Sequence, residues 1–146
     1  EGQLAILAGT DAEEPIREMA EQEQHHLKTF DKIIAERHVR PTILSPLWNV
    51  AGFMLGAGSA LLGPKAAMAC TQAVEEVIDE HYADQAKKLG EDEAELRETI
   101  EEFQADELAH RNKAIEEGAE DAPGYELLTG TIKAGSRIAI WLSTRI

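Results

Sequence analysis

The sequence predicts an all-α fold, a four-helix bundle formed by one domain of 146 residues. Proline is scarce, at five residues, whereas Ala, Glu and Leu, which favour helices, are common. Apolar residues recur every three or four positions over long runs, which is the spacing of one helix face. Glycine or proline stands at the breaks between these runs, where helices end. A chain of this length can bury a core of its own.

The first two helices are expected at residues 3–7 and 11–39. Gly9 follows the first, since glycine readily adopts the left-handed conformation that closes a helix. Pro15 lies in the first turn of the second, where its missing N–H costs no hydrogen bond. Pro41 stops this helix, because the residue before a proline avoids the helical conformation.

Three further helices are expected at residues 65–89, 91–117 and 125–142. Acidic residues crowd the first turns of the middle one, which suits the positive end of the helix dipole. Gly118 ends that helix. The last helix carries Gly135 in its apolar face, where a glycine allows a neighbouring helix to approach closely.

The stretch 42–64 contains no charged residue. A membrane-spanning helix needs about 20 apolar residues, but Pro46, Asn49 and several glycines argue against one here. From Ile43 to Leu62 we expect an interfacial segment with a bend, which lies on a membrane surface with Trp48 at the headgroup level. The alternative is a buried connection packed under the bundle.

The net charge of −14 makes nucleic acid an unfavourable partner. Residues 66–126 hold 19 Asp and Glu against five Lys and Arg, whereas residues 127–146 hold no acidic residue. Arg37, Arg40 and Lys65 flank the uncharged stretch. One end of the molecule is therefore expected to be apolar with a basic rim, which suits an anionic bilayer. An acidic soluble protein with a buried helix is the alternative.

The single cysteine, Cys70, excludes an internal disulfide and fits a reducing compartment. Because the residues around it are small and apolar, a packed thiol is favoured over a reactive one. Carboxylates and imidazoles are therefore the stronger candidates for a functional site.

A Glu-x-x-His motif occurs twice on apolar helix faces, as Glu23 with His26 and as Glu107 with His110. Residues three apart share one face of a helix, so each motif places a carboxylate and an imidazole where a core residue is expected. Glu75 borders the apolar stripe of a third helix. Burying an ionised carboxylate without a partner costs several kcal/mol or more, and a metal ion is one way to compensate.

Bundles that hold two iron or manganese ions take one Glu from each of two helices and a Glu-x-x-His from each of the other two. Carboxylates can bridge two ions, and imidazole suits iron. Glu75 precedes Glu107 by 32 residues, and the same offset from Glu23 falls before residue 1. The pattern therefore predicts the remaining carboxylate upstream of Glu1. Ordinary ion pairs, with His25 or Arg111 as partners, are the alternative explanation.

Taken with these positions, the sequence resembles the demethoxyubiquinone hydroxylase family of ubiquinone biosynthesis, a membrane-bound branch of the ferritin-like di-iron proteins. The likeness covers nearly the whole chain. Its most specific part is the Pro-Leu-Trp-Asn-Val segment, which generic di-iron bundles lack. The matching stretches are 2–5, 22–27, 40–42, 46–53, 55–58, 67–71, 74–76, 81–82, 106–110 and 134–140.

The resemblance implies a set of iron ligands in which the Glu of each Glu-x-x-His bridges two iron ions. It also implies hydroxylation of a polyprenylated 6-methoxy-3-methyl-1,4-benzoquinone with O₂, and NADH as the reductant. His81 and Tyr82 match a pair near the site, and we expect either an electron or proton relay or, for Tyr82, packing. The implied ligands are Glu23, His26, Glu75, Glu107 and His110.

The resemblance further implies a peripheral membrane protein, on the matrix side of the mitochondrial inner membrane or on the bacterial cytoplasmic membrane. The segment from Ile43 to Leu62 would bind the membrane and admit the lipid substrate. A lipid-binding partner protein of the ubiquinone-synthesis complex and a homo-oligomer are further expectations. The family's first-helix motif, His-Ala-Gly-Glu, is missing, and with it the sixth ligand. We therefore expect residues 1–146 to be a ferritin-like di-iron hydroxylase domain truncated at its N-terminus, which by itself is inactive.

Two rival functions use the same features. A non-catalytic helical bundle on the membrane surface would bind isoprenoid quinone lipid and a partner protein, with a degraded metal site. Iron storage or peroxide scavenging, as in ferritin or rubrerythrin relatives, would use the same ligands, but it gives no reason for the uncharged stretch 42–64.

Overall fold

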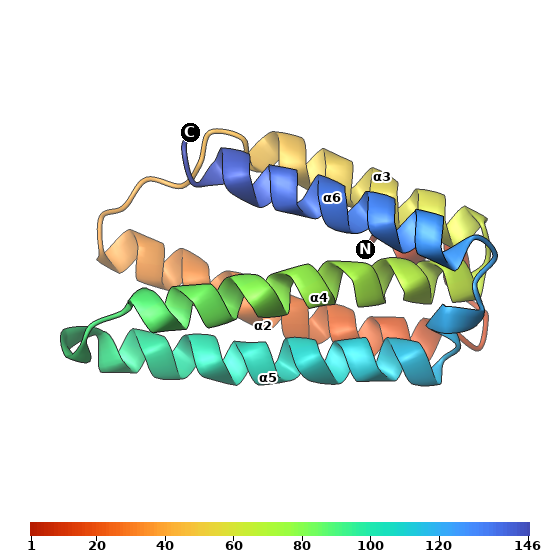
Figure 1. Ribbon diagram of the computed structural model, residues 1–146, viewed down its shortest axis with the longest axis horizontal. Helices are drawn as coiled ribbons and strands as arrows, with labels where there is room; N and C mark the ends of the chain where they lie inside the picture. Colours follow the sequence, from red (N-terminus) through yellow and green to blue (C-terminus); the bar gives the residue numbers. More distant parts are fainter.

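The computed structural model describes residues 1–146 as six α-helices and two short 3₁₀ helices, without a strand. The predicted all-α bundle is therefore confirmed. Figure 1 shows the long helices side by side, with α3 and α6 lying over α4. The helices are α1 (Gly2–Leu7), α2 (Glu13–Glu36), α3 (Ser45–Leu61), α4 (Pro64–Lys88), α5 (Ala94–Glu116) and α6 (Tyr125–Ser143), with η1 (Glu91–Glu93) before α5 and η2 (Ala119–Asp121) after it.

Helix α4 is the centre of the bundle, because it packs against α5 on one side and α6 on another. Its first half is buried all round, and five consecutive residues there are at most 4% exposed: Ala66, Ala67, Met68, Ala69 and Cys70. Small side chains let three neighbouring helices approach one helix at the same level. The packed thiol predicted for Cys70 is confirmed, and burial raises its pKa.

Most of the apolar core lies at the end of the bundle where α1 turns into α2 and α3 turns into α4. Ile16, Met19 and Met68 meet there with alanines of α4, α5 and η2. Further along the bundle the large buried side chains are fewer, and Phe103 of α5 is the largest. This leaves room for polar groups in the middle of the bundle.

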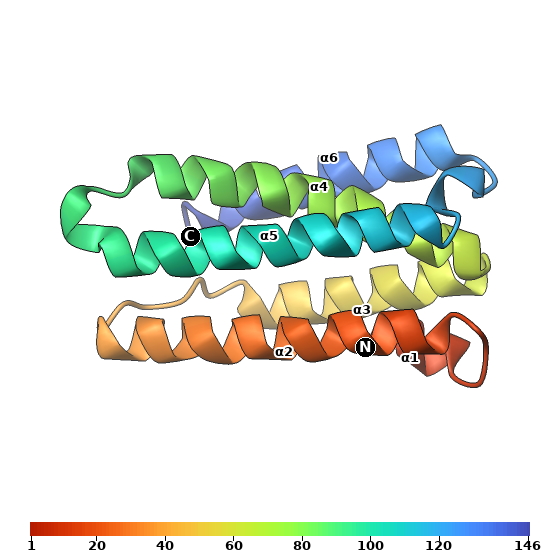
Figure 2. The same ribbon diagram turned by 90° about the horizontal axis from the view of Figure 1, so that it is seen from below.

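Helices α2 and α5 run antiparallel, so the end of α2 lies beside the start of α5 (Figure 2). Arg37, just after α2, forms a bidentate ion pair with Glu93, just before α5. Its Nη1 and Nη2 donate to Oε1 and Oε2 of Glu93 at 2.8 and 2.6 Å. This pair holds the two helices together at the end opposite the apolar core. The antiparallel arrangement also brings the two Glu-x-x-His motifs to the same level.

The bend predicted for the segment from Ile43 to Leu62 is not found: Ser45–Leu61 form one regular helix, α3, because Pro46 falls in its first turn, where proline is tolerated. Trp48 is half-buried and donates from Nε1 to Oγ of Ser143 at 2.8 Å, so it fastens α3 to α6. The opposite side of α3 exposes large apolar side chains. No helix of the bundle combines the length and the apolar composition that crossing a bilayer requires.

The close helix approach expected at Gly135 is not found, because a Cβ at that position would meet no atom within 4 Å. The residue faces out from α6. The close approach occurs instead where α1 crosses α3. A Cβ at Gly2 would lie 2.8 Å from the backbone nitrogen of Ala57, so only glycine fits there.

Candidate metal centre

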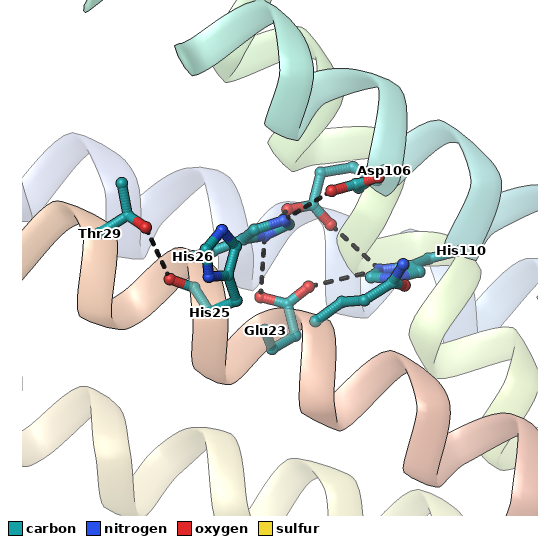
Figure 3. Close-up of polar contacts among 8 residues, drawn as sticks. Glu23, His25, His26, Thr29, Asp106 and His110 are labelled. Atoms are coloured by element: carbon teal, nitrogen blue, oxygen red, sulfur yellow. Dashed lines mark hydrogen bonds and ion pairs between the residues drawn. The ribbon is translucent and has the colours of Figure 1, made fainter.

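The two Glu-x-x-His motifs meet between α2 and α5, where each glutamate faces both histidines. Glu107 places Oε1 3.2 Å from Nδ1 of His26 and Oε2 3.4 Å from Nδ1 of His110. Glu23 places Oε1 3.3 Å from Nδ1 of His110 and Oε2 3.8 Å from Nδ1 of His26. Figure 3 shows Glu23 between the two imidazoles. Each carboxylate thus spans the gap between the same two nitrogens.

Glu75 reaches this cluster from α4. Single ligand atoms of Glu23, Glu75, Glu107 and His110 all lie within 4.8 Å of one another. The fifth predicted residue, His26, is not one of these four, but its Nδ1 lies 3.2 Å from Oε1 of Glu107 and 3.8 Å from Oε2 of Glu23. The structure therefore brings together all five residues that the sequence singles out as metal ligands.

The outer nitrogen of each histidine is held by a residue of the opposite helix. Nε2 of His26 donates to Oδ2 of Asp106 at 3.0 Å, and Nε2 of His110 donates to Oε1 of Gln22 at 2.6 Å. The ring of Phe103 also stacks on His26, with 3.9 Å between the ring centres. These contacts direct Nδ1 of both rings into the cluster, and a hydrogen bond at the outer nitrogen is what a metal-binding histidine usually has.

The electrostatics of the cluster are those of carboxylates crowded in a dry place. Burial raises the pKa of Glu75 well above its ordinary value, and its hydrogen bond to Glu107 acts in the same direction. For Glu107 burial also acts upward, but the close contacts with His110 and Glu75 outweigh it and lower the pKa. Burial opposes the charged form of His110, yet the carboxylates of Glu107 and Glu23, 3.4 and 3.3 Å from Nδ1, raise its pKa to about 9.

Three polar atoms of the cluster are buried without a hydrogen-bond partner: Nδ1 of His26, Nδ1 of His110 and Oε2 of Glu107. Leaving a buried polar group unpaired costs about 1–3 kcal/mol, and more for a charged one. All three atoms face the same gap, and all are metal-ligand atoms. A divalent ion with oxygen and nitrogen ligands therefore fits the residues that are present.

Glu23 departs from the prediction that it lies on a dry face, since 48% of its side chain is exposed. The reason is a pocket of about 420 Å³ that opens beside it, between the cluster and helices α1 and α3. Glu75, Glu107 and Tyr82 also line this pocket. Its apolar wall comes from α3 and α4 and includes Leu55, Val74 and Ile78. A ligand in the pocket would thus touch the carboxylates.

The predicted pair His81 and Tyr82 is divided between two faces of α4. Tyr82 lines the pocket at the cluster, and burial raises the pKa of its phenol, which therefore stays protonated. His81 lines a separate groove between α4 and α6, where burial and the nearby Lys88 lower its pKa. Adjacent residues of a helix point in different directions, so only Tyr82 reaches the carboxylates.

Gln22 and Asp106 were not predicted from the sequence to be partners of the histidines. Each directly precedes the glutamate of a motif, so the full pattern is a polar residue followed by Glu-x-x-His. This pattern occurs twice in the sequence, but each polar residue binds the histidine of the other motif. Asp106 is 80 residues from His26, and Gln22 is 88 residues from His110. Only the antiparallel packing of α2 on α5 identifies them.

Comparison of the sequence with known proteins identifies a family match. Residues 1–143 match the family described as "Ubiquinone biosynthesis protein COQ7". The chain is 54% identical to 3-demethoxyubiquinol 3-hydroxylase of Rhodospirillum rubrum, over 100% of the chain and 69% of that protein. It is 55% identical to the mitochondrial NADPH-dependent 3-demethoxyubiquinone 3-hydroxylase of Dictyostelium discoideum, with the same coverage. It is 40% identical to the mitochondrial 5-demethoxyubiquinone hydroxylase of Saccharomyces cerevisiae, over 90% of the chain and 63% of that protein.

Proposed function

Because this chain belongs to the COQ7 family of ubiquinone biosynthesis proteins, we propose that it is an enzyme that hydroxylates a demethoxylated ubiquinone precursor. The observation that supports this most directly is the set of unpaired metal-ligand atoms between α2 and α5. The named relatives are hydroxylases of the same pathway. The substrate proposed for this chain is a polyprenylated 6-methoxy-3-methyl-1,4-benzoquinone.

Two iron ions are the cofactor that the donor set suits best. Glu23 and Glu107 would contribute to both metal positions, because each divides its oxygens between the two imidazoles. His26 would contribute to one position, and His110 with Glu75 to the other. When bound, a pair of iron ions with carboxylate ligands supplies the activation of O₂ that hydroxylation needs.

The residues of the chain itself would bind and orient the quinone. The pocket of about 420 Å³ falls within the range of small-molecule sites, and its apolar wall of Leu55, Val74 and Ile78 would exclude water from the ring. The phenol of Tyr82 stays protonated and can donate a hydrogen bond to a quinone oxygen. Glu75 lines the same pocket and would face a bound quinone from α4.

The reductant would be a reduced nicotinamide nucleotide. The resemblance implied NADH, whereas the names of the Dictyostelium and mammalian relatives specify NADPH. In the groove between α4 and α6, Lys88 and Arg145 would contact the phosphates of such a ligand beside the exposed indole of Trp141, whereas Arg137 is paired with Glu80 and Asp84 adds a second carboxylate to the lining. The guanidinium of Arg145 already lies 4.3 Å over the centre of the Trp141 ring. His81 lines this groove, where a relay role is proposed for it.

Peripheral membrane binding is part of the proposal, since α3 exposes a row of large apolar side chains. Leu47, Val50 and Met54 share one face and are 55–65% exposed. Exposed apolar patches of this kind mark binding surfaces. The mitochondrial inner membrane and the bacterial cytoplasmic membrane are the proposed locations. We also propose that a lipid-binding partner protein or a second copy of this chain binds any part of this face that the membrane does not cover.

The experiment is to load the purified full-length protein with Fe²⁺ and add a short-chain demethoxyquinone and NADPH under ¹⁸O₂, with residues 1–146 alone as a parallel sample that should stay inactive. We expect about two iron ions per chain, quinone-dependent NADPH oxidation, and one ¹⁸O atom in the product by mass spectrometry. Binding of the quinone with neither iron nor turnover would instead support the non-catalytic lipid-binding bundle. NADH in a parallel reaction identifies the preferred nucleotide.

A further inference from the structure

The two histidines of the metal centre differ in the group that holds their outer nitrogen. His26 donates to a carboxylate, Asp106, whereas His110 donates to a neutral amide, Gln22. The two acceptors occupy equivalent places, since each directly precedes the glutamate of its motif. The two Glu-x-x-His motifs are thus arranged nearly symmetrically, whereas the residues that bind the outer nitrogens of their histidines differ in charge.

The charge of the acceptor changes what the imidazole offers to a metal. A hydrogen bond to an ionised acceptor is roughly twice as strong as one to a neutral acceptor. An acceptor that pulls more strongly on the Nε2 proton makes Nδ1 of the same ring a more basic ligand. By this argument Nδ1 of His26 donates more electron density than Nδ1 of His110.

The surroundings strengthen the distinction between the two rings. The side chain of Asp106 is 36% exposed, so water screens its charge only in part. Phe103 stacks on His26 and holds the ring in the plane that points Nε2 at Asp106. The structure gives no aromatic partner to His110.

We propose that Asp106 and Gln22 are positioning residues that make the two metal positions chemically unequal, with Asp106 strengthening the position at His26 alone. This inference rests on the metal centre of the proposed function. It adds that the inequality comes from two outer residues and not from the inner ligands. Each residue acts through one imidazole, so its effect is confined to one ion.

The test uses Co²⁺, whose bound state is followed by visible absorption and whose nearby protons have strongly shifted NMR signals. The unsubstituted protein should show two exchangeable signals, one from the Nε2 proton of each histidine. Asp106→Asn keeps the size of the side chain and removes its charge. It should weaken one Co²⁺ position by about 10- to 100-fold and move one signal only.

Gln22→Glu is the matched change at the other ring, since it adds a charge without changing size. It should strengthen the other position and move the other signal. The double variant Asp106→Asn/Gln22→Glu has the net charge of the original protein. In this variant the position at His110 should bind Co²⁺ more tightly than the position at His26, the reverse of the original protein. A general electrostatic effect would not reverse the order.

Three results separate the possible failures. If the unsubstituted protein bound no Co²⁺, both the metal centre and this inference would be overturned. If Co²⁺ bound normally but each variant moved both signals equally, or neither, the inference alone would be overturned. If Asp106→Asn lost its helical circular dichroism, Gln22→Glu would still decide, because an unchanged signal from His110 would contradict the proposal.

Discussion

Glu23 and Glu107 face each other across the gap between α2 and α5, and each directs its two oxygens to the same two imidazoles, at 3.2 to 3.8 Å. The relationship is nearly two-fold symmetric because the two helices are antiparallel and carry the same motif. The ion pairs of both glutamates are with these two histidines, and neither pairs with a lysine or an arginine. Both are placed to neutralise charge that lies between them.

Replacing Glu107 by Gln should reduce bound iron from about two ions to fewer than one per chain, because the variant removes a bridging charge from both positions. Inductively coupled plasma mass spectrometry after desalting measures the content. Glu101→Gln is the matched control, since Glu101 is an exposed residue of α5. Two retained iron ions in the Glu107 variant would contradict the assignment of the ligands.

Adding a metal that fits the centre should raise the melting temperature. At a free concentration 100 times Kd the native state gains about 2.7 kcal/mol, which corresponds to roughly 5–10 °C for a chain of this size. Differential scanning fluorimetry with Co²⁺ checks this. Mg²⁺, which prefers oxygen ligands and keeps its waters, should give a much smaller shift. Equal shifts with both ions would argue against a site that uses the histidines.

Replacing Leu47, Val50 and Met54 by Ser should weaken binding to anionic liposomes at least tenfold, because each exposed side chain contributes on the order of 1 kcal/mol when buried. Flotation on a density gradient measures the bound fraction. Leu27→Ser with Leu108→Ser removes exposed apolar residues from α2 and α5 and should leave binding unchanged. Circular dichroism should show the same helix content in all variants, and unaltered flotation of the triple variant would remove α3 from the membrane-binding face.

Trp48→Phe should destabilise the protein by about 1 kcal/mol, since it removes the hydrogen bond from the indole to Ser143 that fastens α3 to α6. The urea midpoint at unchanged slope measures the loss. Trp141→Phe is the control, because Trp141 is 54% exposed. Comparable losses in the two variants would show that the hydrogen bond is not the reason.

Arg145→Ala should raise KM for NADPH several-fold while KM for the quinone stays the same, if the groove between α4 and α6 binds the nucleotide. Steady-state kinetics with each substrate varied in turn tests this. Lys32→Ala, which removes an exposed cation from α2, should change neither constant. A rise in the quinone KM instead would place the residue in the path of the quinone.

The helices could be predicted from the sequence to within a few residues, because glycine and proline stand at their ends. The expected helix at 11–39 is found as Glu13–Glu36, and the one at 65–89 as Pro64–Lys88. Helix α3 was expected to bend because its glycines and Pro46 were read as breaks. A helix tolerates proline in its first turn, and Gly56 of α3 packs against Gly2 and Gln3 of α1. Periodicity alone does not show where a first turn begins.

The inner residues of the candidate site were predictable because their spacing puts them on helix faces. Their geometry was not, since it depends on how α2 packs on α5. The same reason hid Asp106 and Gln22, each of which acts on a distant segment. The exposure of Glu23 depends on a pocket beside α1 and α3. Sequence periodicity shows which face of a helix is apolar, but it does not show where a pocket forms between helices.

Helix α2 supplies two of the ligands, yet after Met19 its only fully buried residue is His26. Its last ten residues are at most half-buried, and they meet α5 through the ring of Phe30, 5.3 Å from that of Phe103, and through the contact of Arg37 with Glu93 just beyond them. Capture of an ion by Glu23 and His26 would add to these contacts and hold this half of α2 more firmly. Loading the centre should consequently slow amide hydrogen exchange over residues 23–36 far more than over α4, so that cofactor delivery and the final docking of this helix become one event.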